Sequence, residues 1–315
     1  MTRHRSQRHS GPRLGSSLAL LLGLLTATAC TQGGERQPAQ AAPTTSTSSP
    51  APTATLIGGQ QVSLQEVEKI EGAVRTYFDA FDGSDFNGLR AHSVGELKIL
   101  ASWQRILSER SGGLDALKPA AASVDRLKVV SVKGNTATVE IKGQLDETAF
   151  VLDNSTGQTK LLSTNISGAV TLVRRAAAWQ VVDFHRGGRW ARQQIYTKVR
   201  GQQTSQGVTV KIIGVDLRPK GTVLMLEIKN TTGLKAGASG TVIREASGKQ
   251  LQIALGRDLV VVQVGRRSKA TSGLFYMNTL RPNTRKFSFL ADVNLGCDPV
   301  CKVSTNLNIP VELLR

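Results

Sequence analysis

Apolar residues recur every three or four positions in two stretches of the chain, which is the spacing of one face of an α-helix. Two helices are predicted from them, over residues 63–81 and 93–110. Each begins with a Ser-x-x-Glu pattern, at Ser63 and at Ser93. In such a capping box the serine accepts a hydrogen bond from the amide three residues on, and the glutamate returns to the cap.

From residue 124 the apolar period changes from 3.6 to about two residues, which is typical of half-buried strands. The strand-like runs before residue 197 cover 124–132, 137–141, 149–152, 161–173 and 179–184. From residue 208 to the end, short alternating runs are separated by turn residues such as Gly, Pro and Asn. That pattern is typical of an all-β sandwich.

Two helices followed by antiparallel strands that end in the run from Trp179 to Phe184 resemble the NTF2-like (SnoaL-like) cone fold over residues 62–197. This resemblance implies an α+β domain in which helices pack on a curved antiparallel sheet around a concave pocket. The runs 207–217 and 224–230 resemble the first hairpin of the DUF4352-type immunoglobulin-like domains of bacterial lipoproteins. The expected fold is therefore an NTF2-like cone followed by an all-β immunoglobulin-like sandwich.

The N-terminal segment indicates export and lipid attachment. Residues 1–13 carry four arginines and no acid, residues 14–25 are apolar, and small residues at 26–29 precede Cys30. A basic region, a short apolar region and small residues are the marks of a signal peptide. The apolar stretch of about 12 to 16 residues is shorter than the roughly 20 that span a bilayer. The cysteine resembles that of a bacterial lipobox, which implies acylation of Cys30, for example with palmitate, and attachment to the outer face of the cell membrane.

The expected organisation follows from composition. Residues 1–29 are assigned to the signal peptide and 30–58 to a disordered tether rich in Ala, Pro, Ser and Thr. Residues 59–197 form the cone, 198–207 a polar linker, and 208–315 the sandwich. Most of the net charge of +17 lies beyond residue 197, where Lys and Arg far outnumber Asp and Glu.

The basic residues of the last third define an expected basic surface. Its members are Arg257, Arg266, Arg267, Lys269, Arg281, Arg285 and Lys286. On an exported protein it would meet anionic lipid or an anionic wall polymer. The alternative is a solvated surface that keeps the protein soluble. Nucleic acid is disfavoured, because the chain carries an export signal and no aromatic residues interleave with these cations.

Candidate catalytic chemistry is sparse. Beyond the predicted signal peptide the only histidines are His92 and His185, and Asp183 lies two residues before the latter. Alternation along a strand places Asp183 and His185 on one face, either concave and able to hold an acid–base pair or solvated, with Val182 and Phe184 opposite. His92 precedes Ser93 and is interpreted as a helix-junction residue.

The leading hypothesis is a non-catalytic binding or envelope-assembly module, which leaves envelope proteins as possible partners. The sequence has no nucleophile elbow, phosphate-binding loop or zinc motif. No cofactor or metal is expected. A carrier for a small apolar ligand is the second hypothesis, with Phe78, Trp103 and Trp179 lining the cone. An enzyme of the SnoaL-like kind, using Asp183 and His185, is the third.

Cys297 and Cys301 are the only other cysteines. Because an exported protein meets an oxidising environment, a disulfide between them is expected. A zinc site would need further ligands, and the chain beyond residue 197 contains no histidine.

Overall fold

The computed structural model describes residues 52–57, 59–81, 85–110, 121–152, 159–252, 262–276, 279–296 and 301–315. The predicted signal peptide, Cys30, most of the expected tether, Arg257 and Cys297 lie outside these ranges. Lipid attachment and the disulfide therefore stay predictions. In the described part, no helix is long and apolar enough to cross a membrane.

A small hairpin of β1 (Thr53–Thr55) and β2 (Gln61–Ser63) leads into helix α1 (Leu64–Asp79), so part of the expected tether forms a strand. The predicted cap is present, because Ser63 Oγ accepts from Glu66 N at 3.2 Å. The Glu66 carboxylate accepts instead from Trp179 Nε1 at 2.9 Å and from Arg174 at 3.0 Å. Glu66 thus ties the first turn of α1 to the sheet beneath it.

The second capping prediction is wrong. Helix α3 (Glu96–Arg110) begins at Glu96, and Ser93 belongs to the bend before it. Ser93 is fully buried, its hydroxyl donates to Leu89 O at 2.5 Å, and its backbone forms a bridge with Val181. An additional short helix, α2 (Phe86–Ala91), is capped by Asp85, whose carboxylate accepts from Gly88 N. His92 ends α2, as expected for a helix-junction residue.

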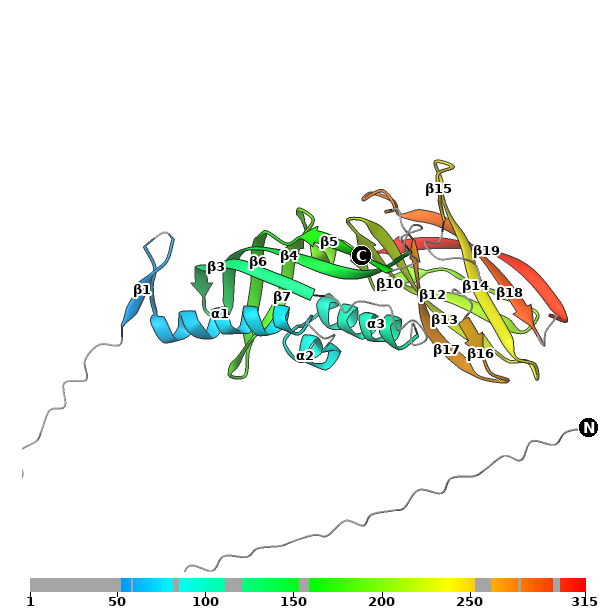
Figure 1. Cartoon of the computed structure of the whole chain (residues 1–315), viewed down its shortest axis with the longest axis horizontal. Helices are drawn as coiled ribbons and strands as arrows, with labels where there is room; N and C mark the ends of the chain where they lie inside the picture. Colours follow the sequence, from blue (N-terminus) through cyan, green and yellow to red (C-terminus); the bar gives the residue numbers. More distant parts are fainter. Residues whose placement is uncertain are drawn as a thin grey trace, which may run out of the picture. The chain divides into compact units, whose positions relative to one another are not determined.

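The strands that follow α3 form one antiparallel sheet in the order β3-β4-β6-β7-β8, with β5 on β4. Their bounds are β3 (Ala121–Lys133), β4 (Thr136–Leu152), β5 (Thr159–Asn165), β6 (Gly168–Arg175), β7 (Ala178–Arg186) and β8 (Arg189–Trp190). Helix α1 packs against β3 and β7 (Figure 1). Its apolar stripe and the inward side chains of the sheet share one hydrophobic core.

The remaining strands form two further antiparallel sheets, which share a second core. The first has the order β11-β12-β13-β17 with β9 on β12, and the second has the order β10-β19-β18-β14-β15 with β16 on β14. The bounds are β9 (Ile195–Tyr196), β10 (Lys198–Arg200), β11 (Gln202–Ser205), β12 (Val208–Arg218), β13 (Gly221–Asn230), β14 (Ala236–Glu245), β15 (Gln250–Gln252), β16 (Val262–Val264), β17 (Lys269–Tyr276), β18 (Lys286–Leu295) and β19 (Val303–Leu314).

The expected α+β cone followed by an immunoglobulin-like sandwich is wrong. Strands make up 59% of the described residues and helical segments only 18%, so the chain is mostly β, with several curled sheets. The reason lies in the first half, where β3 and β4 run for 13 and 17 residues and dominate over the helices. Hydrophobic periodicity identifies the type of an element, but it does not determine how sheets associate.

The expected linker is also structured. Its residues form β10, which pairs with β19, and β11, which pairs with β12. These edge strands look like a linker in sequence because their side chains are mostly exposed and polar. Strand β9, from the expected first domain, pairs with β12 as well. Residues 50–315 consequently form one compact unit, without a break at residues 198–207.

Candidate functional site

A β-bulge in β7 changes the predicted alternation of side chains at Val182. Val181 pairs with Leu172 and Asp183 with Thr171, which leaves Val182 without a partner in the ladder. One extra residue shifts the inward and outward alternation. Phe184 is therefore in the core with Val181, Val182 is half-buried, and Asp183 is 1% exposed. The expectation that Val182 and Phe184 share a face is wrong.

Asp183 serves as a local structural acceptor. Its Oδ1 accepts from Phe184 N at 2.9 Å and from Arg192 N at 3.0 Å, and Oδ2 lies 3.0 Å from Arg192 Nε. Burial raises the pKa of this carboxyl, and the bonds from the two amides and the Arg192 charge offset part of that effect. The carboxylate thus fixes the turn between β8 and β9.

His185 does not join Asp183. Its ring packs edge-on against Trp190, with centroids 4.3 Å apart, and no hydrogen bond between His185 and Asp183 occurs in the described structure. His92 lies at the end of α2. The hydrogen-bonded Asp183–His185 pair that the enzyme hypothesis requires is therefore absent from β7.

We predict that Asp183→Asn changes the free energy of unfolding by less than about 1 kcal/mol, because the amide oxygen can still accept from both backbone N–H groups. Asp183→Ala leaves those donors without a partner and should cost about 1–3 kcal/mol. Urea unfolding at neutral pH measures both changes. Equal losses in the two variants would show that the negative charge, and not the acceptor, is what matters.

The aromatic residues expected to line a pocket lie in the core. Phe78 is fully buried and packs against Phe184, with ring centroids 5.4 Å apart. Trp103 and Trp179 are 6% and 4% exposed, and Trp103 fills the space above Gly214 on β12. None of the three lines either of the two grooves described below. Their placement gives the carrier hypothesis no support.

The expected basic surface divides into two groups. Lys269 pairs with Lys229 at one end of the β13–β17 ladder, and Arg266 and Arg267 precede it. The other group, Arg281, Arg285 and Lys286, follows the far end of β17, which lies about 23 Å away at 3.3 Å per residue. Among the described residues, the expected surface is therefore two separate basic regions rather than one.

All three cations of the second group have partners. Arg281 lies 3.7 Å from Glu245 and Lys286 lies 3.5 Å from Glu312. Arg285 donates to the Tyr196 hydroxyl at 3.2 Å and its guanidinium also lies over the Tyr196 ring. Of these residues, Glu245, Lys286 and Glu312 line a groove.

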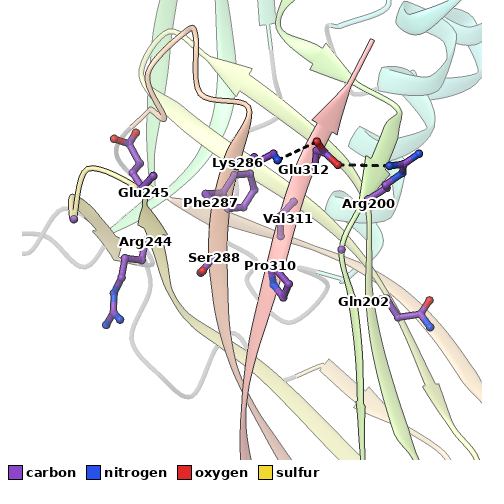
Figure 2. A pocket seen from close by; sticks show the side chains of 13 residues that line it. Arg200, Gln202, Arg244, Glu245, Lys286, Phe287, Ser288, Pro310, Val311 and Glu312 are labelled. Carbon is purple, nitrogen blue, oxygen red and sulfur yellow. Dashed lines mark ion pairs between the residues drawn. The ribbon is translucent and has the colours of Figure 1, made fainter.

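That groove has a volume of about 700 Å³ and crosses one end of the outer face of the β10-β19-β18-β14 sheet. The charged residues that line it are Arg200, Arg244, Glu245, Lys286 and Glu312. Figure 2 shows Glu312 on β19 between Lys286 and Arg200, with Pro310 beside it and Arg244 on the far side of Lys286. Cross-strand register explains this row, because Glu312 is opposite Arg200 on one side and Lys286 on the other.

The electrostatics of the groove leave positive charge available. The Glu312 carboxylate is 3.7 Å from Arg200 and 3.5 Å from Lys286, whose side chains are 75% and 74% exposed. Exposed pairs of this kind are worth only about 0–1 kcal/mol. Arg244 is exposed and has no ion pair among the described residues. A ligand can therefore contact all three cations at little cost.

A smaller groove, of about 340 Å³, lies beside the Asp183–Arg192 turn, with Glu96, Arg192, Tyr196 and Lys198 among its residues. The residues that line this smaller groove carry both positive and negative charges. The described residues contain no group of His, Cys, Asp and Glu that could hold a metal ion.

A buried ion-pair cluster, which the sequence analysis did not find, joins the two cores. Arg186 at the end of β7 is fully buried and donates to Glu147 on β4 at 3.2 Å and to both oxygens of Asp216 on β12. Arg218 Nε reaches the same Asp216 carboxylate at 2.9 Å, and Gln194 accepts from Arg186 Nε at 3.2 Å. In the sequence, one feature could have indicated this cluster. Arg186 lies two residues after Phe184, so alternation along the strand places both side chains on the inward face.

The charges in this cluster balance. Burial alone raises the pKa of Asp216, but Arg186 and Arg218 outweigh that effect and hold the pKa below its ordinary value. Two guanidiniums and two carboxylates in the core thus form a neutral network without access to solvent. Its geometry serves to connect β4, β7 and β12 and offers no room for a substrate.

Comparison with known proteins assigns no family: the chain matches no protein-family model and no curated protein sequence.

Proposed function

We propose that this chain is a lipid-anchored extracytoplasmic protein that acts as a non-catalytic binding module, and that the groove in Figure 2 binds an acidic segment of a partner protein in the cell envelope. The N-terminal pattern that ends at Cys30 supports the anchor. The groove supports the binding role, and its row of exposed cations is the observation that carries the proposal.

The spacing of the cations favours an extended ligand. Arg200 and Lys286 lie on strands separated by β19, which places them roughly 10 Å apart, and Arg244 is on the next strand. A single small anion cannot contact all three. A chain that crosses the strands and carries several negative groups can.

The remaining lining favours a polypeptide over a uniformly charged polymer. Glu245 and Glu312 would repel a polyanion at two positions, whereas a protein segment can place neutral or basic side chains there. Pro310 is exposed beside Glu312 and offers an apolar contact. Because no aligned acid–base pair is present in β7, the proposal includes no catalytic step.

Photo-crosslinking in cells tests the proposal. A photoreactive residue at Ser288, in the groove, should form an adduct with an acidic segment of one envelope protein. The same residue at Asn306, exposed on the same strand as Glu312 but outside the groove, should not. Arg200→Glu with Lys286→Glu should lower the adduct yield at least about tenfold, because two attractive contacts become repulsive.

The control reverses two exposed charges elsewhere, Arg126→Glu with Lys128→Glu on β3, and should leave the yield unchanged. Equal adducts from positions 288 and 306, or an adduct that survives reversal of Arg200 and Lys286, would refute binding in the groove.

A further inference from the structure

The loops at one end of the two C-terminal sheets bring together six exposed cations from four segments. The cations are Lys229, Lys235, Arg266, Arg267, Lys269 and Lys302, and we call this set the basic loop end. β13 and β18 end here, and β14, β17 and β19 begin here. Backbone bonds join the loops, since Arg267 N donates to Thr232 O and Gly296 N to Lys235 O.

A buried asparagine holds this end in shape. Asn230 is 1% exposed, and its amide nitrogen donates to Leu234 O at 2.7 Å and to Gly265 O at 2.9 Å. Its amide oxygen accepts from the Thr232 backbone and hydroxyl at 2.9 and 2.7 Å. One side chain thus fixes the 230–235 loop and the 265–268 turn, which display most of the cations.

The backbone at the centre of this end is also constrained. Arg267 has a φ of +47°, a left-handed conformation that side chains other than glycine rarely adopt. Such a residue persists where its surroundings determine it, here through the Thr232 and Asn230 bonds. Arg266 and Arg267 are therefore presented in a fixed way on an exposed turn.

Within the described residues, carboxylates balance almost none of the positive charge at the basic loop end. Lys269 pairs with Glu227 at 3.0 Å, and that is the one ion pair any of the six cations makes in this part of the structure. No large hydrophobic side chain is exposed at this end, because the exposed ones described are Ile57, Leu64 and Ile99. Neither groove reaches these loops. The cations of the basic loop end thus lie on loop tips outside both described grooves.

We infer that the basic loop end docks on the headgroups of an anionic bilayer and so orients the anchored protein at the membrane surface. Exposed loop tips that lie outside both described grooves suit a planar surface better than a polymer strand, which binds along a groove. Each Lys or Arg near an anionic leaflet adds about a fivefold preference for it. This inference rests on the proposed lipid anchor, which keeps the loops near the membrane.

The experiment uses the full mature protein, purified with its anchor and reconstituted in vesicles. A donor dye is attached at Gly233→Cys, an exposed position in the 230–235 loop where a Cβ would meet nothing within 4 Å. Acceptor dyes lie in the headgroup layer. Energy transfer should be high on vesicles containing phosphatidylglycerol, low on pure phosphatidylcholine, and lost in 1 M salt, where the Debye length is about 3 Å.

Matched variants distinguish the effect of the basic loop end from the effect of the protein's overall positive charge. Lys235→Gln, Arg266→Gln and Arg267→Gln together should lower the ratio of docked to free protein by about a hundredfold, to the level on neutral vesicles. The control neutralises three exposed cations of β3 and β4, Arg126→Gln, Lys128→Gln and Lys142→Gln, and should keep the transfer. A second label at Gly72→Cys, exposed on α1 and equally free of contacts, should show no gain on anionic vesicles.

Two results would overturn the inference. One is equal transfer from Gly233→Cys on neutral and anionic vesicles. The other is binding of soluble polyphosphate to the loop end without a gain on anionic vesicles, which would assign these cations to a polymer. Failure of the anchor is distinguishable, because a protein without it would not remain with phosphatidylcholine vesicles at all.

Discussion

Replacing Arg186 with methionine is expected to lower the free energy of unfolding by about 3–5 kcal/mol, the usual cost of removing one partner from a buried ion pair. The side chain is fully buried and is the link between Glu147 on β4 and Asp216 on β12. Without it, two buried carboxylates would face only Arg218. Urea or thermal unfolding of the purified variant measures the change.

Two controls identify the cause of that loss. Adding Asp216→Leu to Arg186→Met removes the excess negative charge and should recover part of the stability, since apolar replacement of a complete buried pair is often neutral. Arg105→Met breaks an exposed pair with Glu109 and should cost no more than about 1 kcal/mol. Additive losses in the double variant would contradict a charge-balanced network.

Acid titration provides a second readout of the same network. The pKa of Asp216 in the folded chain is below its ordinary value, so its contribution to stability is present at neutral pH and is lost as the pH falls through the folded value. In Arg186→Met, burial should instead raise the pKa of Asp216. Protonation then relieves the buried charge, and the gap in stability between the two proteins should narrow as the pH falls from 7 toward about 4.

Replacing Cys30 with alanine is expected to release the protein from the membrane. The thiol of Cys30 is the proposed acylation site, so the variant cannot carry the acyl chains that the proposed anchor requires. A single acyl chain binds only marginally, whereas two or three make attachment stable. Cell fractionation with labelled palmitate should show a complete loss of label and a shift of protein out of the membrane fraction.

The matching control is Cys301→Ala, which removes a cysteine outside the signal. It should keep both the label and the membrane fraction. Retention of the Cys30→Ala protein in the membrane with palmitate still attached would contradict the assignment of the anchor.

Hydrophobic periodicity predicted the helices well where one apolar stripe faces one core. The stripe of α1 includes Ile70, Val74 and Phe78, all fully buried, and the cap at Ser63 is where the pattern indicates. The pattern at Ser93 is similar, but that serine is buried against Val181, and tertiary contact outweighs its capping preference.

The candidate sites were harder to predict, because they depend on events that leave little trace in sequence. A bulge at Val182 takes that residue off the face of Phe184, and local contacts turn Asp183 to Arg192 and His185 to Trp190. The groove joins residues from five strands, of which β10 and β11 were interpreted as a linker because they are short and polar. The Arg186 cluster spans more than 30 positions of sequence, and no local pattern identifies such partners.

The central claim is that this protein is a lipid-anchored binding module. The most direct test of the anchor is the mass of the intact protein extracted from membranes. The account predicts a chain that begins at Cys30, lacks residues 1–29, and carries the added mass of two or three acyl chains on that residue. A chain that begins elsewhere, or an unmodified Cys30 in the membrane-bound protein, would contradict it.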